Sequence, residues 1–369
     1  MSLAVSSSRQ WRDIAETLVV AAGGGTLFTW IGFPAGWLAG AMCASAAAAL
    51  VGRKIFLPQW VARPCFVLLG TSLGAVATPE TLAGMASWPL SIVIVCVAMG
   101  VVTIATITYL RLMHGWDKQT AMFAAIPGGL SQVMAIAAEC GADLRAVGIV
   151  QTLRLLILAV GIPVGLAAFG LAGPSRPPAN VVSLFDAPGE FVVLLALSAG
   201  LAMALLKVGF PGGLIFGPLV MSAVLHGTSL VHVTLPPWLV SVSMVGLGAV
   251  AGSRFTGTSI RTLLRFLGAG LGAFAVGVSI AASFAVVASS LMSLRISDVV
   301  VAYSPGAVDV MMILALALHL DPVFVGAHHL ARLFTVTLAL PVAVRWLGVT
   351  PKPDDDVRPS VTKDDDLDD

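Results

Sequence analysis

Charged residues are scarce in this sequence: Asp, Glu, Lys and Arg make up 11% of its 369 residues, whereas hydrophobic residues make up 58%. A soluble globular domain contains about 25% charged residues, so this chain lacks the material for a solvated surface. Long apolar stretches recur along nearly the whole chain instead, and about 20 residues let a helix cross the hydrocarbon core of a bilayer. The composition excludes an ordinary soluble domain and predicts an all-α, polytopic membrane protein.

Cysteine is also rare. The four cysteines stand singly in apolar surroundings, without the paired spacing of a zinc site or a redox motif, and we interpret them as packing residues. They are Cys43, Cys65, Cys96 and Cys140. We expect no cleavable signal peptide, because residues 6–16 are polar and the apolar run from Thr17 does not end at an Ala-x-Ala site. That run is expected to be the first membrane span.

The sequence also lacks the parts that several function classes need. A Gly-rich nucleotide loop and a cluster of metal ligands are both missing, so we expect no cofactor, no metal site and no enzymatic activity. A basic, solvated module for nucleic acid is missing too, because the longest polar stretch is the acidic tail after Lys352. Direct binding of nucleic acid is therefore not expected.

One part of the sequence recurs. Phe33-Pro-Ala-Gly36 returns 177 residues later as Phe210-Pro-Gly-Gly213, and Pro127-Gly128 returns 178 residues later as Pro305-Gly306. Further matches at the offset of 178 are Gly70 with Gly248, Gly74 with Gly252, Asp143 with Asp321, Arg154 with Arg332, and Pro163 with Pro341. Compositional bias would align Leu or Ala, but not rare intramembrane Pro and Arg in the same order. The sequence predicts two homologous repeats, and the paired glycines predict close helix packing.

Each repeat is expected to contain about five spans and one interrupted segment. The apolar runs cover 14–31, 34–51, 60–78, 88–110 and 145–171 in the first repeat, and 189–206, 211–227, 236–253, 265–292 and 323–346 in the second. Between the fourth and fifth run of each repeat lies a segment broken by Pro-Gly, at 119–143 and 297–321. Such a segment either crosses the membrane or enters it and returns on the same side.

Loop charges favour the returning, re-entrant arrangement, since Lys and Arg concentrate in short cytoplasmic loops. With both segments re-entrant and the N-terminus inside, Arg176 and Arg295 are the only loop cations on the outer side. Full crossings would instead place Arg254, Arg261 and Arg265 outside. We therefore predict an odd number of spans per repeat, an inverted second repeat, and both termini in the cytoplasm of a bacterial inner membrane.

The predicted organisation is a cytoplasmic N-terminus (1–13), membrane repeat 1 (14–172), an inter-repeat loop (173–188), membrane repeat 2 (189–347) and an acidic disordered tail (348–369). Inverted repeats with interrupted helices are the plan of many secondary transporters, whose site lies near the midplane. Irregular backbone survives at that depth only when it is buried in protein or lines a wet cavity. The two Pro-Gly segments are therefore the place to look for a site.

The two breaks read Ala125-Ile-Pro-Gly-Gly-Leu-Ser-Gln132 and Tyr303-Ser-Pro-Gly-Ala-Val-Asp-Val310. Proline interrupts the helical hydrogen bonds, and the helix that restarts would direct its free N–H groups at an anionic group. A proline kink that only shapes packing is the alternative. The candidate contacts for a solute or ion are Pro127, Gly128, Gly129, Ser131 and Gln132 in the first repeat, and Pro305, Gly306 and Asp309 in the second.

A second group of candidates surrounds the two intramembrane arginines, Arg154 and Arg332. Helical spacing places Gln151 one turn before Arg154, and His328 and His329 one turn before Arg332. A charge at membrane depth usually faces a cavity or a partner, so each arginine is a candidate for binding a solute or ion. Each could equally clamp carbonyls freed by the broken helix, or pair with Asp309, Glu139 or Asp143. Adjacent histidines point about 100° apart on a helix, which does not favour a metal site, whereas their protonation could couple to transport.

Taken together, these motifs resemble those of the AbrB family of bacterial membrane proteins, from about residue 15 to residue 347. The resemblance is carried by the two Phe-Pro-x-Gly motifs, Ile126-Pro-Gly-Gly-Leu-Ser131 with Val150-Gln-Thr-Leu-Arg154, and Ser304-Pro-Gly-Ala307 with Ala327-His-His-Leu-Ala-Arg332. It implies an internally duplicated membrane protein with a role in regulating gene expression; members also carry the label ammonia monooxygenase. Because metal and flavin machinery is missing, we do not expect the monooxygenase activity.

Two functions of different class remain. The first is a secondary-transporter-like carrier or exporter of a small, anionic solute, with the lipid bilayer and a solute or coupling ion as its partners. The second is a membrane sensor that affects gene expression through another protein. The sequence leaves the oligomeric state open, and a homo-oligomer is compatible with it.

Overall fold

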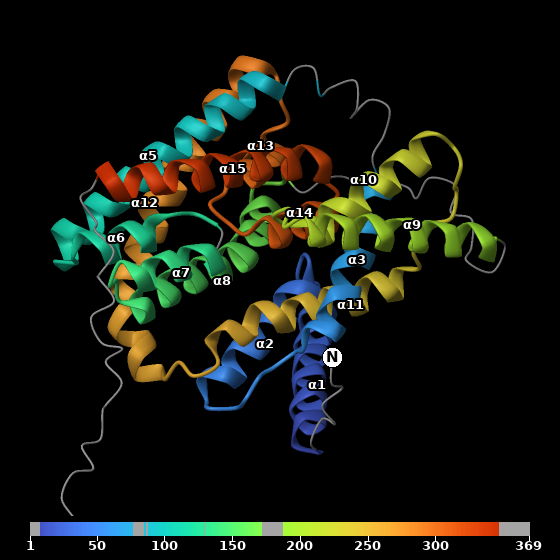
Figure 1. The fold of residues 1–369 in the computed structure, drawn as a ribbon, viewed down its shortest axis with the longest axis horizontal. Coiled ribbons are helices and arrows are strands. Elements are labelled where there is room, and N and C mark those ends of the chain that lie inside the picture. Colours follow the sequence, from blue (N-terminus) through green and yellow to red (C-terminus); the bar gives the residue numbers. More distant parts are fainter. Residues whose placement is uncertain (1–7, 77–84, 86–87, 129, 172–186, 347–369) are drawn as a thin grey trace, which may run out of the picture.

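The regular elements of the chain are helices, as the composition predicts (Figure 1). The structure is a computed structural model, which describes residues 8–76, 85, 88–128, 130–171 and 187–346. The acidic tail and most of the inter-repeat loop lie outside these ranges. In the first half the helices are α1 (Ser8–Trp30), α2 (Gly36–Leu50), α3 (Gln59–Ala75), α5 (Trp88–His114), α6 (Lys118–Ala125), α7 (Leu130–Glu139) and α8 (Leu144–Ala168). In the second half they are α9 (Pro188–Lys207), α10 (Gly213–Gly227), α11 (Pro237–Gly252), the 3-10 helix η2 (Ser253–Phe255), α12 (Ile260–Met292), α13 (Ile296–Tyr303), α14 (Val308–Ala317) and α15 (Pro322–Trp346).

Each of the ten predicted spans coincides with a helix, but the helices differ in length. Within the described ranges, six helical segments are long and apolar enough to cross a membrane: Trp88–His114, Leu144–Ala168, Pro188–Lys207, Pro237–Phe255, Ile260–Met292 and Pro322–Leu340. α2 and α10 contain 15 residues each, so they rise only about 22 Å and fall short of a hydrocarbon core of about 30 Å. The structure thus shows a membrane-embedded helical bundle, and the number of complete crossings stays a prediction.

The helices of the two halves follow one another in the same order and have closely matching lengths. α6 and α13 have 8 residues each, α7 and α14 have 10, and α8 and α15 have 25. Left-handed backbone conformations recur as well: Ala35 (φ 58°) corresponds to Gly212 (φ 71°), and His319 (φ 57°) to Gly141 (φ 71°). These correspondences are what a duplicated sequence leads one to expect.

The paired glycines lie where helices of different halves pack against each other. A Cβ added to Gly74 of α3 would meet the carbonyl oxygen of Leu219 in α10 at 2.2 Å. In the matching contact, a Cβ on Gly252 of α11 would meet the carbonyl oxygen of Met42 in α2 at 2.7 Å. The prediction that these glycines allow close helix packing is therefore confirmed, and each glycine face packs against the opposite half.

Each Pro-Gly segment folds back on itself, as the re-entrant arrangement predicts. The backbone N–H of Asp143, at the end of the first segment, donates to Oγ1 of Thr120 near its start over 2.9 Å. In the second segment, the N–H of Asp321 donates to Oδ1 of Asp298 over 3.0 Å. Asp143 and Asp321 then accept hydrogen bonds from the first N–H groups of α8 and α15, and so cap these helices. Each pair of half-helices is thus a closed hairpin that precedes a long helix.

The two hairpins are buried to different extents. α14 lies near the centre of the molecule, against α3, α8 and α15 (Figure 1), and its residues Val310–Ala315 are all fully buried. α7 lies nearer the edge, where Ile136 is half-buried and Glu139 is exposed. The second hairpin therefore contributes more of the apolar core than the first.

Candidate functional site

Both hairpins break at their proline. α6 ends at Ala125, and Gly128 then takes a positive φ of 96°, which glycine adopts without strain. α13 ends at Tyr303, and α14 begins at Val308. Gly129 lies outside the described residues, as do the side chains of Ser131 and Gln132, so their predicted role stays untested by the structure.

The two intramembrane arginines clamp the carbonyl groups at these breaks. Arg154 donates from Nη2 to the carbonyl oxygen of Ile126 over 3.2 Å, with a longer contact of 3.5 Å from Nη1 to Ala125. Arg332 donates from Nη1 to Ser304 over 2.7 Å and from Nη2 to Gly306 over 2.5 Å. These carbonyls lie at the C-terminal ends of α6 and α13, where the helix dipole favours a cation.

The residue one turn before each arginine makes the equivalent contact. Nε2 of Gln151 donates to the carbonyl oxygen of Phe123 over 2.8 Å, and Nε2 of His329 faces the carbonyl oxygen of Val301 at 3.1 Å. Because a carbonyl only accepts, this His329 nitrogen carries a hydrogen. The substitution of histidine for glutamine thus preserves the backbone contact at that position.

The arginines have no acidic partner among the residues that the structure describes. The ion pairs found there involve Arg53, Lys54 and His232, and no carboxylate reaches Arg154 or Arg332. The alternative that Asp309, Glu139 or Asp143 neutralises them is therefore not what the structure shows. Arg154 and Arg332 are 7% and 1% exposed, their charges repel each other, and Nε of each lacks a hydrogen-bond partner. Two buried positive charges are stabilised by carbonyl dipoles alone.

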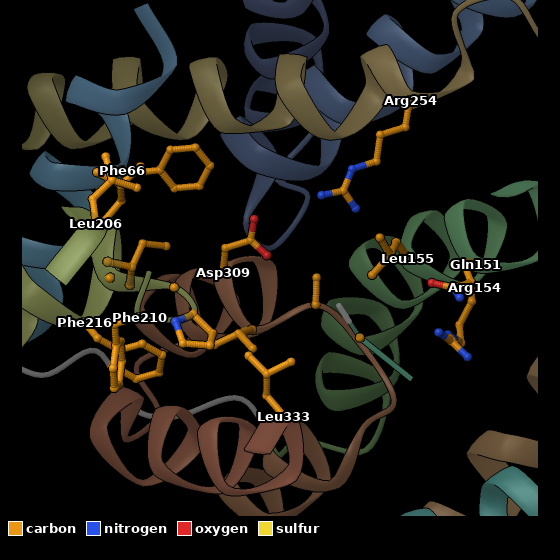
Figure 2. A pocket seen from close by; sticks show the side chains of 18 residues that line it. Phe66, Gln151, Arg154, Leu155, Leu206, Phe210, Phe216, Arg254, Asp309 and Leu333 are labelled. Atoms are coloured by element: carbon orange, nitrogen blue, oxygen red, sulfur yellow. The ribbon is translucent and has the colours of Figure 1, made fainter. Parts of the chain in front are cut away.

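A cavity of about 570 Å³ lies between the two hairpins and the α9–α10 turn (Figure 2). Its wall includes Gly128 from the first break and residues 307–309 from the second, so both breaks face one space. The remaining lining residues are Phe66, Gln151, Arg154, Leu155, Leu206, Phe210, Pro211, Gly212, Gly213, Leu214, Ile215, Phe216, Arg254 and Leu333. The cavity is mostly apolar, with a few charged and polar groups.

Two charged side chains, Arg254 and Asp309, face this cavity from opposite walls (Figure 2). Arg254 lies in η2, directly after α11, and Asp309 lies in the first turn of α14. Both are half-buried, and neither forms a hydrogen bond or ion pair with any described residue. A bound molecule therefore has a cation and a carboxylate available to it.

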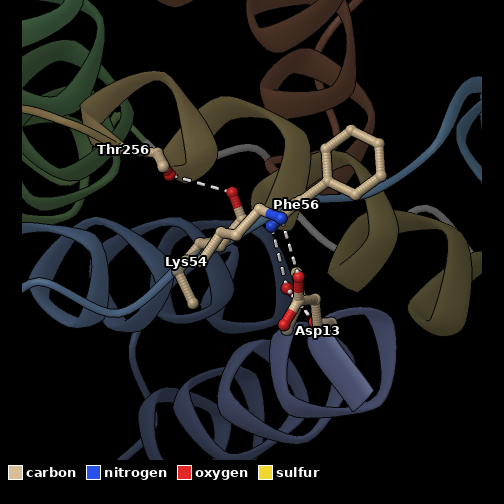
Figure 3. A network of polar contacts seen from close by, with 6 residues as sticks. Asp13, Lys54, Phe56 and Thr256 are labelled. Atoms are coloured by element: carbon tan, nitrogen blue, oxygen red, sulfur yellow. Dashed lines mark hydrogen bonds and ion pairs between the residues drawn. The ribbon is translucent and has the colours of Figure 1, made fainter. Parts of the chain in front are cut away.

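Polar contacts with the α2–α3 loop fix the turn that carries Arg254 (Figure 3). Oγ1 of Thr256 donates to the carbonyl oxygen of Ile55 over 2.8 Å. The loop is in turn held to α1, because Lys54 pairs with Asp13 at 3.0 Å and the N–H of Phe56 donates to Oγ1 of Thr17 over 3.0 Å. These contacts restrict the position of Arg254 at the cavity mouth.

The structure brings only part of the predicted site together. Gly128, Gln151, Arg154 and Asp309 line the cavity. The predicted residues that do not line it are Pro127, Pro305, Gly306, His328, His329 and Arg332. Arg332 still lies close to it, since a Cβ on Gly128 would stand 3.8 Å from Nη2 of Arg332.

His328 belongs to a separate, buried hydrogen-bond network. Its Nδ1 faces the carbonyl oxygen of Phe324 at 2.8 Å and must donate, and its Nε2 forms a hydrogen bond with Oγ of Ser91 at 2.9 Å. Oη of Tyr303 donates to the carbonyl oxygen of Ser91 over 2.8 Å. These bonds join α5 to α13 and α15. No group of three His, Cys, Asp or Glu side chains in the described ranges is arranged to hold a metal ion.

Sequence reasoning missed Arg254 and the aromatic wall of the cavity. It assigned Arg254 to a cytoplasmic loop because the residue follows an apolar run and stands near other cations. The available signal was the repeated Phe-Pro-x-Gly motif, whose second copy supplies Phe210–Gly213 to the cavity. In the sequence this motif marks the repeat, and nothing local to it indicates a site.

Comparisons with known proteins agree with this architecture. The family described as "Transition state regulatory protein AbrB" matches residues 2–75 and 37–348. A protein of Escherichia coli K12 named "Putative regulator AbrB" is 26% identical over 327 residues, which cover 87% of this chain and 92% of that protein. A Bacillus subtilis 168 protein named "Uncharacterized protein YhjN" is 25% identical over 355 residues, covering 89% and 92% of the two chains. No solved structure matches this chain.

The family match extends over more than half of the chain and includes both hairpins, both arginines and the cavity. In the part of the chain that the structure describes, six helical segments are long and apolar enough to cross a membrane, as a membrane-embedded family requires. The chain therefore belongs to the AbrB family of membrane proteins.

Proposed function

We propose that this protein is a secondary-transporter-like carrier or exporter of a small solute that bears an anionic group. The observation that carries the proposal is the cavity shared by both hairpin breaks, where Arg254 and Asp309 have no ion-pair partner among the described residues. Charges at membrane depth usually mark a substrate or ion pathway. Broken helices that meet at one cavity are the arrangement of binding sites in many secondary transporters.

The balance of charge supports an anionic group on the solute. Arg154 and Arg254 line the cavity, and Arg332 lies beside it, whereas Asp309 is the one carboxylate among the lining residues. The first turn of α14 adds N–H groups that have no partner within the helix, and these also favour an anion. A neutral or purely cationic solute would leave most of these groups unmatched.

The loop charges support a multi-pass protein of the bacterial inner membrane with both termini in the cytoplasm. Under that topology Lys207 and Arg254 lie on the cytoplasmic side. Arg254 itself lines the cavity, and Lys207 directly follows the lining residue Leu206. We propose that the described conformation opens toward the cytoplasm.

A sensor is the second candidate, because one relative carries the name of a regulator. In that case the same cavity would bind a small molecule, and the signal would pass to another protein without direct contact with nucleic acid. We propose neither enzymatic activity nor a cofactor for either function, and a homo-oligomer is compatible with both.

Reconstitution into liposomes tests the carrier. We expect uptake of a solute from a panel of labelled metabolites to depend on a proton or sodium gradient. Arg254→Gln and Asp309→Asn should reduce that uptake about tenfold or more without loss of folded protein, because neither side chain has a structural partner. Arg261→Gln, an exposed arginine of α12, is the matched control and should leave uptake unchanged.

Absence of gradient-dependent flux for every solute in the panel would reject the carrier. The sensor would then be tested in cells, by asking whether Asp309→Asn changes transcript levels as a deletion does.

A further inference from the structure

The two unpaired charges of the cavity have opposite sign. Ion pairs do form elsewhere among the described residues, such as Lys54 with Asp13 and Arg53 with Glu16. Arg254 and Asp309 face the same space and yet do not pair with each other. Protein charges in a mostly apolar cavity are costly unless something neutralises them. A single molecule with both charges would neutralise the two at once.

The rest of the cavity defines the remainder of such a molecule. Phe66 of α3, Phe210 before α10 and Leu333 of α15 line it, and none of them offers a polar group. A volume of about 570 Å³ leaves room for an apolar side chain in addition to the charged groups. An inorganic anion would leave both this apolar wall and Asp309 without a contact.

We infer that the solute is a zwitterionic amino acid with an apolar side chain, whose carboxylate binds Arg254 and whose ammonium group binds Asp309. The planar guanidinium of Arg254 suits a carboxylate because it donates two parallel hydrogen bonds. The carboxylate of Asp309 accepts from an ammonium group. Phe66, Phe210 and Leu333 surround the side chain. This inference rests on the proposed function, since it names the solute class of the same cavity.

Asp309 has one competing role, that of the binding group for a coupling proton or sodium ion. The two roles differ in their consequence for ligand choice. If Asp309 holds an ammonium group, an analogue that lacks the amine loses affinity. If Asp309 serves only a coupling ion, the amine is irrelevant to binding.

Equilibrium binding to the purified full-length protein in detergent tests the inference, because it requires no transport. The probes are leucine, its deaminated analogue 4-methylpentanoate and its decarboxylated analogue isopentylamine. Leucine should bind about tenfold or more tighter than either analogue, since each analogue leaves one charged group unpaired.

Charge-neutralising variants assign each contact. Asp309→Asn should abolish the preference for leucine over 4-methylpentanoate, and Arg254→Gln should abolish the preference over isopentylamine. Arg261→Gln should keep both preferences. Equal affinity of the unmodified protein for leucine and 4-methylpentanoate would overturn the inference.

The binding experiment tests the solute class and the flux experiment tests the carrier, so a negative result in one leaves the other hypothesis standing. Binding of leucine without gradient-driven flux in liposomes would reject the carrier and support the solute class. Flux of another solute, with no binding of leucine or phenylalanine, would support the carrier and reject the solute class.

Discussion

At the scale of single residues, several left-handed backbone positions hold a side chain where the other half of the protein has glycine. Ala35 precedes α2 with a φ of 58°, and its counterpart Gly212 precedes α10 with a φ of 71°. In this conformation an L-residue with a side chain strains the folded state by about 1–2 kcal/mol. Glycine avoids this strain, but it raises the entropy of the unfolded chain and so lowers stability by about 0.4–1 kcal/mol. The strain of the side chain in the folded state is therefore larger than the entropic disadvantage of glycine.

We therefore expect Ala35→Gly to stabilise the protein, by roughly 0.5–1 kcal/mol. Thermal unfolding in detergent would show the change as a higher midpoint. The reciprocal variant Gly212→Ala should lower the midpoint, because its new Cβ would also stand 3.1 Å from the ring of Phe216. A lower midpoint for Ala35→Gly would contradict the argument from backbone strain.

The buried arginines differ in how firmly they hold the hairpin breaks. Arg332 makes contacts of 2.5 and 2.7 Å, whereas those of Arg154 are 3.2 and 3.5 Å. Replacement by lysine keeps the charge but removes the two-pronged donor. We expect Arg332→Lys to destabilise the protein by about 2–3 kcal/mol, and Arg154→Lys by less, because shorter hydrogen bonds are lost at Arg332.

Chemical denaturation or heating in detergent, followed by circular dichroism, measures this difference. No loss in either variant would show that the charge, and not the clamp on the carbonyls, determines stability. Equal loss in the two would contradict the dependence on hydrogen-bond length.

At the scale of helices, glycine sets the distance between the two halves. A Cβ on Gly74 would meet backbone atoms of α10 at 2.2 Å, which no rotamer change can relieve. We expect Gly74→Ala to destabilise the protein by at least about 1–3 kcal/mol through overpacking. Gly100→Ala in α5 is the matched control, since an added Cβ there meets nothing within 4 Å. The yield of monodisperse protein and its thermal midpoint would report both effects.

The sequence predicted the helices, the hairpins and the glycine contacts because each of these has a local or repeated signal. Pro127-Gly128 and Pro305-Gly306 mark the breaks of the two hairpins, and Gly74 and Gly252 mark close contacts between helices. The clamp on the carbonyls was among the predicted roles of Arg154 and Arg332.

The cavity could not be predicted in the same way, since its walls come from α3, the α9–α10 turn, η2, α14 and α15, which are distant in sequence. Arg254 illustrates the reason. Its neighbours in sequence indicate a loop, and only the packing of α11 against α2 and α3 places its side chain at the cavity.

At the scale of the whole molecule, each half packs its glycine-bearing helix against the other half. α3 contacts α10, α11 contacts α2, and α5 contacts α12. This exchange of equivalent contacts is what two repeats related by a two-fold axis would produce, and the charge map predicts that the axis lies in the membrane plane.

Cysteine labelling of intact cells tests that orientation. In a background without the four native cysteines, cysteines at positions 175 and 295 should react with an impermeant reagent, and one at position 260 should not. Reaction at position 260 before cell lysis would overturn the inverted arrangement. A reagent that crosses the membrane should label all three positions and serves as the control for accessibility.

The glycine contacts between the two halves also determine when these interfaces can form during synthesis of the protein. α3 ends at Ala75, but its partner α10 ends only at Gly227, so the face of Gly70 and Gly74 has no partner during the synthesis of the residues between them. At about 5–20 residues per second, that interval lasts roughly ten to thirty seconds. During that interval the α3 face that later contacts α10 stays uncovered in the bilayer. The quality control of the partly synthesised chain depends on what covers this face until α10 has been made.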